Sequence, residues 1–547
     1  MKKIILQHIV MSSNIVPDTD PLFCKDCRGP LPISLDKGEV LNLRAHFNFI
    51  PIGVLAKMGI SDITIYVEKE GDAKISLFID DCPTPFHEGT IDGPVEITVP
   101  DGTIMGIMIE ALEKCTISGG EISCRTDRVN TVRLKHVICT YRREKEMVRK
   151  IDSITRYMKE YGIGDEYELI VIDNGGTLNI PGMEIINSKN LGGSAGFSRG
   201  MMDAIKKDGT HILLNDDDAV FEPEILFRTI SLLSVMDRET IIGGSMISLK
   251  HPFIINESGA YCDNKVIKSL KHGTDISDIS GNVDLARPEK IGHTGWWYSV
   301  FPASLVKEIG YSLPFFIKED DVEYGLRAKM EKITVCGITV WHPGPRYDPS
   351  LNYYYFRNHL STMATHEMLD RNVIKLFTLK IWLELSAYRY DNAEMMILGI
   401  KDFLKGPDYV YHKCEEKRIT SEVQLDRLEN LRKEDDFSAI PPKHGVIFRL
   451  LTMNGLFFKS IGCTEKSVWD ANESDFYRIK RILYRVDDDS GFIADKSIRK
   501  TVLLSLVSAT MYLRLLLCKK GKMRTYSEKL PIYSSEEQWK KVLEIDE

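Results

Sequence analysis

Short apolar runs with alternating polar positions fill the first 130 residues or so. They occur at Ile63–Val67, Lys74–Ile79, Val95–Val99 and 106–109, and clusters of Gly, Pro and Asp separate them. Period-two alternation over a few residues predicts half-buried strands, and even spacing with turn residues favours an antiparallel β-sandwich. We therefore expect a β-sandwich domain over residues 1–130.

Two segments of this region allow a more specific prediction. The start, MKKIILQHIV, has a short apolar stretch broken by Gln7 and His8 and is followed by no small-residue cleavage site, so it predicts a first strand and not a secretory signal. The segment Cys115–Cys124, CTISGGEISC, has two glycines between alternating runs. This pattern predicts a hairpin that turns at Gly119 and Gly120.

From His136 the pattern becomes an alternation of strands and helices. The predicted strands are 136–141, Tyr167–Asp173, Met183–Ile186 and His211–Leu214. Glu144–Tyr161 has apolar side chains at helical spacing, and Ser194 is expected to cap a second helix. Such alternation predicts a parallel α/β sheet over residues 131–360, whose ligands bind at the carboxyl ends of the strands.

Beyond about residue 360 the pattern is helical to the end, which predicts a helical domain over 361–547. The strongest helix, Ser497–Cys518, places basic residues beside a Leu- and Val-rich stretch. It is either a buried bundle or oligomer helix or an interfacial helix attracted to anionic lipid. Its uncharged run, Thr501–Leu513, is shorter than the roughly 20 residues that span a bilayer, so we expect no transmembrane helix.

Composition excludes several classes of protein. The chain has 547 residues, a net charge of −8 and a pI near 6.0, which argues against a nucleic-acid partner. Its 11 scattered cysteines fit a reducing compartment better than a disulfide scaffold, so we expect a cytoplasmic protein.

The candidate chemistry begins with three consecutive aspartates, Asp216, Asp217 and Asp218, at the end of the predicted strand HILLN. Carboxylates one residue apart at a strand end point the same way and offer hard oxygen ligands to Mg²⁺ or Mn²⁺. The alternative is a solvated acidic turn.

Three further features accompany this triplet. Gly295-Trp296-Trp297-Tyr298 offers aromatic faces, which stack on sugars or fill a core. Phe315–Ile317 predicts a short strand before Asp320 and Asp321, where a helix begins, and a carboxylate there serves as a general base or as a helix cap. His342 follows a β-rich run and suits either a metal shell or a buried hydrogen-bonded role.

Seven motifs occur in the order CTYRRE, Asp173-Asn174-Gly175, NLGGSAGFSRG, NDDD, GWW, EDDVEYGLR and WH. In this order they resemble the inverting family 2 glycosyltransferases of the GT-A fold, and most of all the bacterial cell-wall galactofuranosyltransferases that use UDP-galactofuranose. The resemblance covers about residues 1–400 in layout and 136–345 in motifs. Arg142 and Glu144 depart from the family, which carries Asn and Pro at these positions.

The resemblance implies a role for each matched residue. Asp216, Asp218 and His342 would bind Mn²⁺ or Mg²⁺, and Asp321, with Asp320 beside it, would be the catalytic base. The nucleotide or donor sugar would contact Tyr141, Arg143, Asp173, Asn190 and Asp217, and the acceptor would contact Trp296 and Trp297.

The implied reaction moves galactofuranose from a UDP-sugar to a hydroxyl of a surface polysaccharide or lipid-linked glycan. Transfer of another sugar, such as rhamnose from its dTDP donor, and an inactive glycan-binding or assembly protein are the alternatives. A homo-oligomer and peripheral contact with the inner face of the cell membrane are further expectations.

Overall fold

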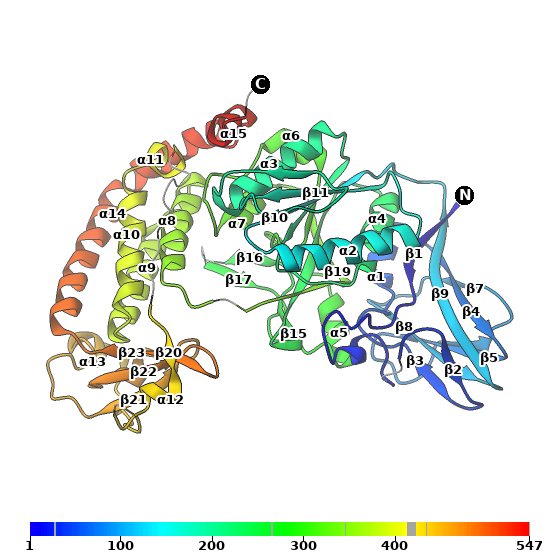
Figure 1. The fold of residues 1–547 in the computed structure, drawn as a ribbon, viewed down its shortest axis with the longest axis horizontal. Coiled ribbons are helices and arrows are strands. Elements are labelled where there is room, and N and C mark those ends of the chain that lie inside the picture. The colour runs from blue at the N-terminus through cyan, green and yellow to red at the C-terminus, as the bar shows by residue number, and fades with distance from the viewer. Residues whose placement is uncertain are drawn as a thin grey trace. The chain divides into compact units, whose positions relative to one another are not determined.

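The computed structural model describes residues 1–26, 29–263, 266–344, 346–412, 419, 423–433 and 435–545 (Figure 1). The chain forms two compact units. The first comprises Met1–Ser312, Asp321–Gly344 and Trp539–Glu547, and the second comprises Leu313–Asp320 and Pro345–Gln538. The expected boundary near residue 130 therefore does not separate compact units, and the second unit also takes in a short segment before Asp321.

The N-terminal part of the first unit contains two antiparallel sheets. One has the order β1 (Lys2–His8), β9 (Cys115–Thr126), β4 (Asp62–Glu70) and β7 (Val95–Thr98), with β2 (Ile33–Leu35) also paired to β9. The other has the order β3 (Val40–Asn42), β8 (Met105–Ala111), β5 (Ala73–Ile79) and β6 (His87–Thr90). The predicted alternation appears in β4, where Ile63, Ile65 and Val67 are buried. These side chains belong to a hydrophobic cluster that continues into the central sheet, which is why no boundary appears.

The predicted hairpin at Gly119-Gly120 is wrong, because β9 runs without a turn from Cys115 to Thr126. A Cβ at Gly120 would lie 2.6 Å from the carbonyl oxygen of Tyr66 on the paired strand β4. Glycine here permits close approach of two strands, a use that the local sequence does not distinguish from a turn.

The central sheet has eight strands. Their order is β12 (Ile185–Asn187), β11 (Tyr167–Asp173), β10 (Leu134–Thr140), β13 (His211–Asp216), β18 (Ser299–Pro302), β14 (Ile241–Ser248) and β15 (His251–Glu257), with β19 (Lys332–His342) also paired to β14. The four predicted strands are β10 to β13, and they pair in parallel, as expected. β18 is antiparallel to both β13 and β14, so the whole sheet is mixed. Thr140, Asp173 and Asp216 consequently end neighbouring strands at one edge.

Helices α2 (Glu144–Glu160), α3 (Gly192–Lys206) and α4 (Glu224–Val235) belong to this sheet region. The predicted cap at Ser194 is wrong, because α3 begins at Gly192, after Leu191, and Ser194 is buried in its first turn. The glycines of NLGGSAGFSRG allow close packing of α3. A Cβ at Gly196 would lie 2.1 Å from Cys139 Sγ, and one at Gly200 would lie 2.1 Å from Val137 Cγ1, both on β10.

The remaining elements of the first unit are short. They are η1 (Asp20–Leu22), α1 (Ile52–Lys57), β16 (Ala260–Asp263), β17 (Val266–Ser269), α5 (Ile279–Ala286) and α6 (Ala303–Ile309). Helix α7 (Asp320–Arg327) begins where the chain re-enters this unit.

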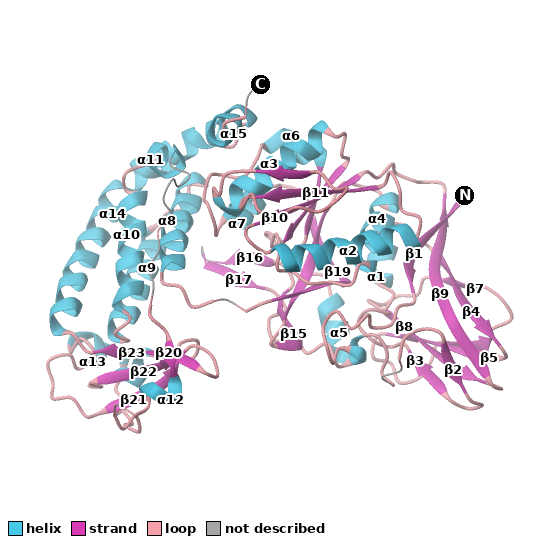
Figure 2. Cartoon of the chain, viewed as in Figure 1, coloured by secondary structure: helices cyan, strands magenta, loops and turns pink. Residues whose placement is uncertain are grey.

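The second unit combines helices with a small sheet (Figure 2). Its helices are α8 (Ser350–Thr365), α9 (Arg371–Ser386), α10 (Tyr390–Phe403), α11 (Pro407–His412), α12 (Leu428–Leu431), α13 (Val446–Leu451), η2 (Glu473–Phe476), α14 (Ile498–Tyr533) and α15 (Glu536–Leu543), whose last turns leave this unit. The sheet has the order β20 (Asp426–Arg427), β23 (Ser490–Asp495), β22 (Arg481–Arg485) and β21 (Cys463–Ser467). The expectation of an all-helical region is therefore wrong. The signal for strands was the short apolar run Ile482–Tyr484, rich in β-branched and aromatic residues, before an Asp- and Ser-rich turn.

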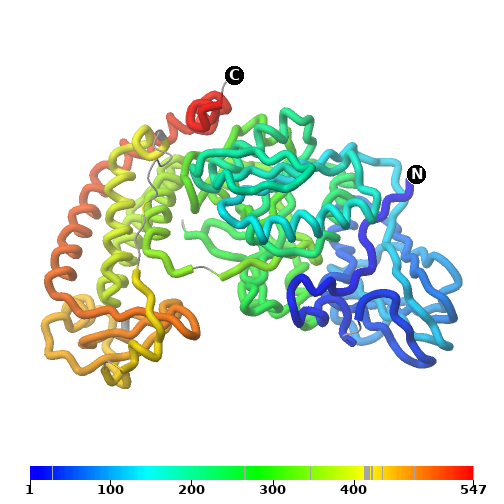
Figure 3. The backbone as a smooth tube through the Cα atoms, viewed as in Figure 1, coloured from blue at the N-terminus to red at the C-terminus, as the bar shows by residue number. Residues whose placement is uncertain are grey.

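Helix α14 is both a bundle helix and an exposed one. It packs along α8, α9 and α10, as Figure 3 shows for the orange helix beside the yellow-green ones, and buries residues such as Leu504 and Met511. Its outer face exposes Leu503, Leu506 and Leu513. An 18-residue window of α14 has a mean hydropathy of 1.8, so by length and composition this helix is sufficient to cross a membrane. The expected uncharged run, Thr501–Leu513, was shorter because it ended at the single charge of Arg514. The absence of a transmembrane helix stays a prediction.

Candidate active site

Asp216, Asp218 and His342 meet at the carboxyl edge of the central sheet. Asp216 ends β13, Asp218 lies in the turn that follows, and His342 ends β19. His342 Nε2 lies 3.0 Å from Asp218 Oδ1 and 3.8 Å from Asp216 Oδ2. One potential ligand atom from each residue lies within 4.8 Å of the others. Two carboxylate oxygens and an imidazole nitrogen are a donor set that suits Mn²⁺ or Mg²⁺.

The ring of His342 is held by its other nitrogen, Nδ1, which donates to the carbonyl oxygen of Pro343 at 2.8 Å. Such a backbone partner is typical of metal-binding histidines, since it fixes the ring and directs Nε2. Burial lowers the pKa of His342, but the hydrogen bonds and charges of Asp216 and Asp218 outweigh it and raise the pKa to about 10. Coordination requires a neutral imidazole, so a metal ion is expected to release this proton.

Two cations face the aspartates from the chain around α2. Arg143 lies 3.0 Å from Asp218 and 3.5 Å from Asp217. Lys150 donates to the carbonyl oxygen of Asp216 at 2.8 Å and to Oδ1 of Asn215 at 3.3 Å. Burial lowers the pKa of Lys150 to about 8 against the attraction of the three aspartates. These cations partly offset the negative charge that the triplet concentrates.

Asp217 has a different partner from the two aspartates that pair with His342. Its Oδ2 accepts a hydrogen bond from Thr140 Oγ1 at 2.8 Å, at the end of β10. Burial raises the pKa of Asp217, against the lowering effect of Arg143. Asp217 therefore has a different hydrogen-bond partner from Asp216 and Asp218, and the division of roles among the three aspartates stays a prediction.

A pocket of about 420 Å³ adjoins this cluster. Arg143, Lys150, Asp217 and Asp218 line it, together with the apolar side chains of Ile154 and Phe221. The volume is in the range of small-ligand sites. Cationic, carboxylate and apolar surfaces are thus available together at the sheet edge.

The remaining predicted nucleotide contacts differ in accessibility. Tyr141 is exposed, with the guanidinium of Arg142 5.1 Å from its ring centre. Asn190 precedes α3 and accepts a hydrogen bond from the Gly192 amide at 3.3 Å. Asp173 is 1% exposed, and its carboxylate accepts from the backbone amides of residues 175, 177 and 178, each at 2.7 Å. Asp173 therefore shapes its own turn, and its burial leaves it almost no surface for a nucleotide.

The two tryptophans also differ. Trp296 is buried and packs edge-on against Phe197 and Tyr324. Trp297 is partly exposed; its Nε1 donates to the carbonyl oxygen of Gly244 at 2.8 Å, and its own carbonyl accepts a hydrogen bond from Asn215. The structure thus places Trp296 in the core, where its face is not available for stacking, and the predicted acceptor contact remains open for Trp297.

Asp320 and Asp321 begin α7, as predicted, but the expected strand at Phe315–Ile317 is absent. Phe316, Lys318 and Glu319 instead have positive φ angles of 72°, 68° and 71°. Non-glycine residues avoid this region, and strain of this kind is frequent at functional sites. The chain is therefore forced through an unfavourable path immediately before the predicted base.

Asn358 of α8, buried in the second unit, holds this strained loop. Its side-chain amide donates to the carbonyl oxygens of Phe315, Ile317 and Lys318 at 3.1, 2.8 and 3.0 Å. Sequence reasoning missed Asn358, and also Lys150 and Thr140, because their partners are distant in the chain. Lys150 offered a weak signal, since it lies on the helix that follows the CTYRRE motif.

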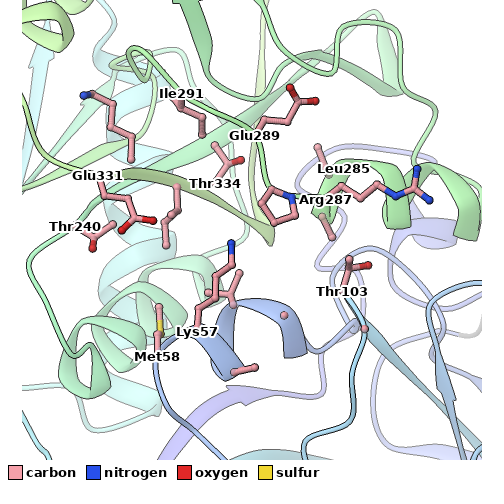
Figure 4. Close-up of a pocket in the computed structure, with 18 of the residues that line it drawn as sticks. Lys57, Met58, Thr103, Thr240, Leu285, Arg287, Glu289, Ile291, Glu331 and Thr334 are labelled. Atoms are coloured by element: carbon pink, nitrogen blue, oxygen red, sulfur yellow. The ribbon is translucent and has the colours of Figure 1, made fainter.

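A second pocket of about 420 Å³ lies elsewhere in the first unit (Figure 4). Lys57 of α1 extends toward it, and Glu289 and Glu331 lie at its margin. Lys271 pairs with Glu289, and Arg238 pairs with Glu331, each at 2.9 Å. None of its described lining residues is aromatic, so this pocket lacks a sugar-stacking face.

No protein-family model matches this chain. Comparison with characterised proteins finds galactofuranosyltransferase GlfT2 of Mycobacterium tuberculosis, 29% identical over 256 residues, which are 43% of this chain and 40% of that protein. GlfT2 of Mycolicibacterium smegmatis is 30% identical over 257 residues, 43% of this chain and 39% of that protein. The match thus spans about two fifths of the length of these relatives, and it confirms the resemblance that the motifs predict.

Among solved structures, the chain matches a mannosyltransferase, PcManGT, from Pyrobaculum calidifontis in complex with GDP-Man and Mn²⁺. The identity is 12%, the match covers 45% of this chain and 67% of that one, and the TM-score is 0.30.

Proposed function

We propose that this chain is a metal-dependent, inverting glycosyltransferase of the GT-A type, similar over 43% of its length to the galactofuranosyltransferases. The proposed reaction moves galactofuranose from UDP-galactofuranose to a hydroxyl of a surface polysaccharide or lipid-linked glycan. The observation that carries this proposal is the convergence of Asp216, Asp218 and His342 at the carboxyl edge of the sheet.

Asp216, Asp218 and His342 would hold a divalent cation. When bound, this ion supplies Lewis-acid stabilisation of the negative charge that develops on the diphosphate leaving group. Asp217 would contact the donor sugar or ribose, while Tyr141, Arg143 and Asn190 would contact the nucleotide. Arg143 would exchange part of its pairing with the aspartates for phosphate oxygens, which match a guanidinium equally well.

Asp321 would accept the proton of the acceptor hydroxyl as the hydroxyl oxygen attacks the anomeric carbon. The bond from that carbon to the diphosphate oxygen breaks in the same displacement, and UDP leaves with the electron pair. A single displacement inverts the anomeric centre. Asp320 would lie beside the base, and Trp297 would contact the acceptor.

Thermal unfolding of the full chain with UDP or dTDP, each with and without Mn²⁺, tests the proposal. A ligand that binds the folded state raises the unfolding temperature by mass action, so UDP with Mn²⁺ is expected to give the largest increase. A larger increase in unfolding temperature with dTDP than with UDP would indicate that the donor is a dTDP-sugar and not UDP-galactofuranose. No increase with either nucleotide would overturn the enzyme assignment in favour of a glycan-binding protein.

Incubation with a panel of nucleotide sugars, followed by measurement of released UDP or dTDP, identifies the donor. Release from UDP-galactofuranose that requires both acceptor glycan and Mn²⁺ is the expected result.

A further inference from the structure

The segment from Ile440 to Ile461, which we call the apolar loop, exposes an unusual number of large apolar side chains. It contains α13 and lies in the second unit, beside the sheet of β20 to β23 (Figure 1). Its exposed members are Ile440, Val446, Ile447, Phe448, Leu450, Leu451, Phe457, Phe458 and Ile461. Four of these have exposed fractions between 65% and 88%. Large apolar side chains exposed together in one short segment mark a candidate interaction site.

Burial in α13 is the reverse of that in an ordinary surface helix. Arg449, its charged residue, is 5% exposed, and its Nε donates to the carbonyl oxygen of His444 at 3.1 Å. Val446, Ile447, Phe448, Leu450 and Leu451 face outward. In water this arrangement costs free energy on both counts, since apolar surface is hydrated and a charge is desolvated. The cost of hydrating the apolar side chains is removed where the outer face of α13 contacts an apolar environment.

The apolar loop accepts hydrogen bonds from basic side chains of other segments of the second unit. Arg478 donates to the carbonyl oxygen of Lys459 at 2.8 Å. Lys496 donates to the carbonyl oxygens of Gly455 and Phe458, each at 3.3 Å. The outward position of Phe457 and Phe458 is therefore set by the fold of the second unit.

Charge indicates what covers this surface. No Asp or Glu occurs from Phe437 to Thr464, although the chain as a whole has a net charge of −8. Lys443 and Lys459 are exposed at the two ends of the apolar loop. Apolar side chains flanked by lysines, without acidic residues, complement a bilayer of anionic lipids, where rings and aliphatic chains enter the interface and lysines contact headgroups.

We propose that the apolar loop inserts into the interfacial region of an anionic lipid bilayer and attaches this protein to the membrane surface. This inference goes beyond the proposed function and does not depend on it. The proposal also differs from the expectation that α14 contacts the lipid, because the segment with outward apolar side chains and a buried arginine is the apolar loop.

Flotation of the full chain with vesicles tests the proposal. One set of vesicles contains phosphatidylcholine with phosphatidylglycerol, and the other contains phosphatidylcholine alone. The wild type is expected to float with the anionic vesicles. Ile447→Ser with Leu451→Ser is expected to lower this partitioning at least about tenfold, because two inserted side chains lose their apolar burial.

Leu513→Ser with Leu517→Ser in α14 is the matched control, since these leucines are also exposed in the second unit. This pair is expected to float within about twofold of the wild type, as for surface substitutions outside an interface. Phe457→Ser with Phe458→Ser provides a second disruption of the apolar loop if the first pair fails to fold. Lys443→Gln and Lys459→Gln are each expected to reduce partitioning to anionic vesicles about fivefold.

Three results would overturn the proposal. The first is a wild type that floats with neither kind of vesicle. The second is flotation of the apolar loop variants at the wild-type level. The third is loss of flotation by the α14 pair while the apolar loop pairs keep it. Sedimentation velocity distinguishes a second copy of the chain: a dimer that the apolar loop variants dissociate, without vesicle binding, would assign this surface to self-association. Because lipid binding is measured without nucleotide sugar, its failure is separate from failure of the proposed reaction.

Discussion

Two runs of three aspartates occur in this chain, and the structure places them in opposite environments. Asp487–Asp489 form the turn between β22 and β23, and all three side chains are exposed. Asp487 accepts hydrogen bonds from the backbone amides of Asp489 and Ser490 at 2.9 and 2.7 Å. Asp216–Asp218 follow a buried strand and meet His342, Arg143 and Lys150 from other parts of the chain.

The difference shows what converts an acidic triplet into a candidate metal site. The hairpin triplet satisfies its hydrogen bonds locally and keeps its charges in water. The sheet-edge triplet concentrates partly buried charges that distant cations only partly offset, and a site that costs stability in this way is a candidate for ligand binding.

The largest expected difference between the two runs is in metal-dependent transfer. Asp218→Ala removes a proposed ligand and is expected to reduce transfer on the order of 10³-fold, since Lewis-acid stabilisation contributes several kcal/mol. The Mn²⁺-dependent increase in unfolding temperature with UDP should also disappear. Asp488→Ala, at the hairpin, should change neither measurement. Equal effects of the two substitutions would contradict the assignment of the metal site.

A second effect separates the metal site from the base. Asp321→Asn is expected to lower the transfer rate at least about 10²-fold, because the amide does not accept the acceptor proton. The thermal shift with UDP and Mn²⁺ should remain that of the wild type. Transfer near the wild-type rate, with Asp320→Asn inactive instead, would move the base to Asp320.

His46 is a buried titratable group outside the site, and it is expected to stay neutral in the folded chain. Its ring nitrogens bond Asn282 and Thr339 at 2.7 and 2.8 Å, and burial lowers its pKa to about 4. The unfolded chain, with an ordinary histidine pKa near 6.5, binds more protons between pH 4 and 6.5. His46 therefore contributes full stability above about pH 6.5 and loses it as the pH falls toward 4.

Urea unfolding at pH 7 and pH 5 measures this loss. The wild type should lose about 2 kcal/mol more than His46→Gln over this interval, from the linkage between pKa and stability. Equal losses in the two proteins would show that His46 does not titrate differently in the folded state.

The smallest expected effect is a gain in stability. Burial raises the pKa of Asp217, so its charged form is disfavoured in the folded chain. Asp217→Asn removes that charge and is expected to raise the free energy of unfolding by about 1 kcal/mol. Residues kept for function often lower stability, and their replacement then stabilises the fold. Asp488→Asn should leave it unchanged. Destabilisation by Asp217→Asn would show that its pairing with Arg143 and Thr140 outweighs its burial.

Local pattern predicted the strands from Leu134 to Asp216 and the helix α2 with the correct buried face, because alternation and helical spacing are properties of neighbouring residues. The same reasoning failed where a residue serves a distant partner. Gly119 and Gly120 have the composition of a turn but lie within a strand. The segment around Arg481–Arg485 forms a sheet where the pattern predicts helix. At Phe315–Ile317 the apolar run predicted a strand, whereas Asn358 holds a strained loop.

The order of residues supplies the chemical groups: three adjacent carboxylates after an apolar strand, a histidine after another, and motifs in a recognisable order. Which of these groups lie close together depends on the folded chain. It brought His342 to Asp218, directed Asp173 to its own backbone and buried Trp296, while a second aspartate triplet remained an exposed turn. Proximity between residues far apart in the chain depends on strand order and register, which arise from packing of the whole sheet and which no local pattern encodes.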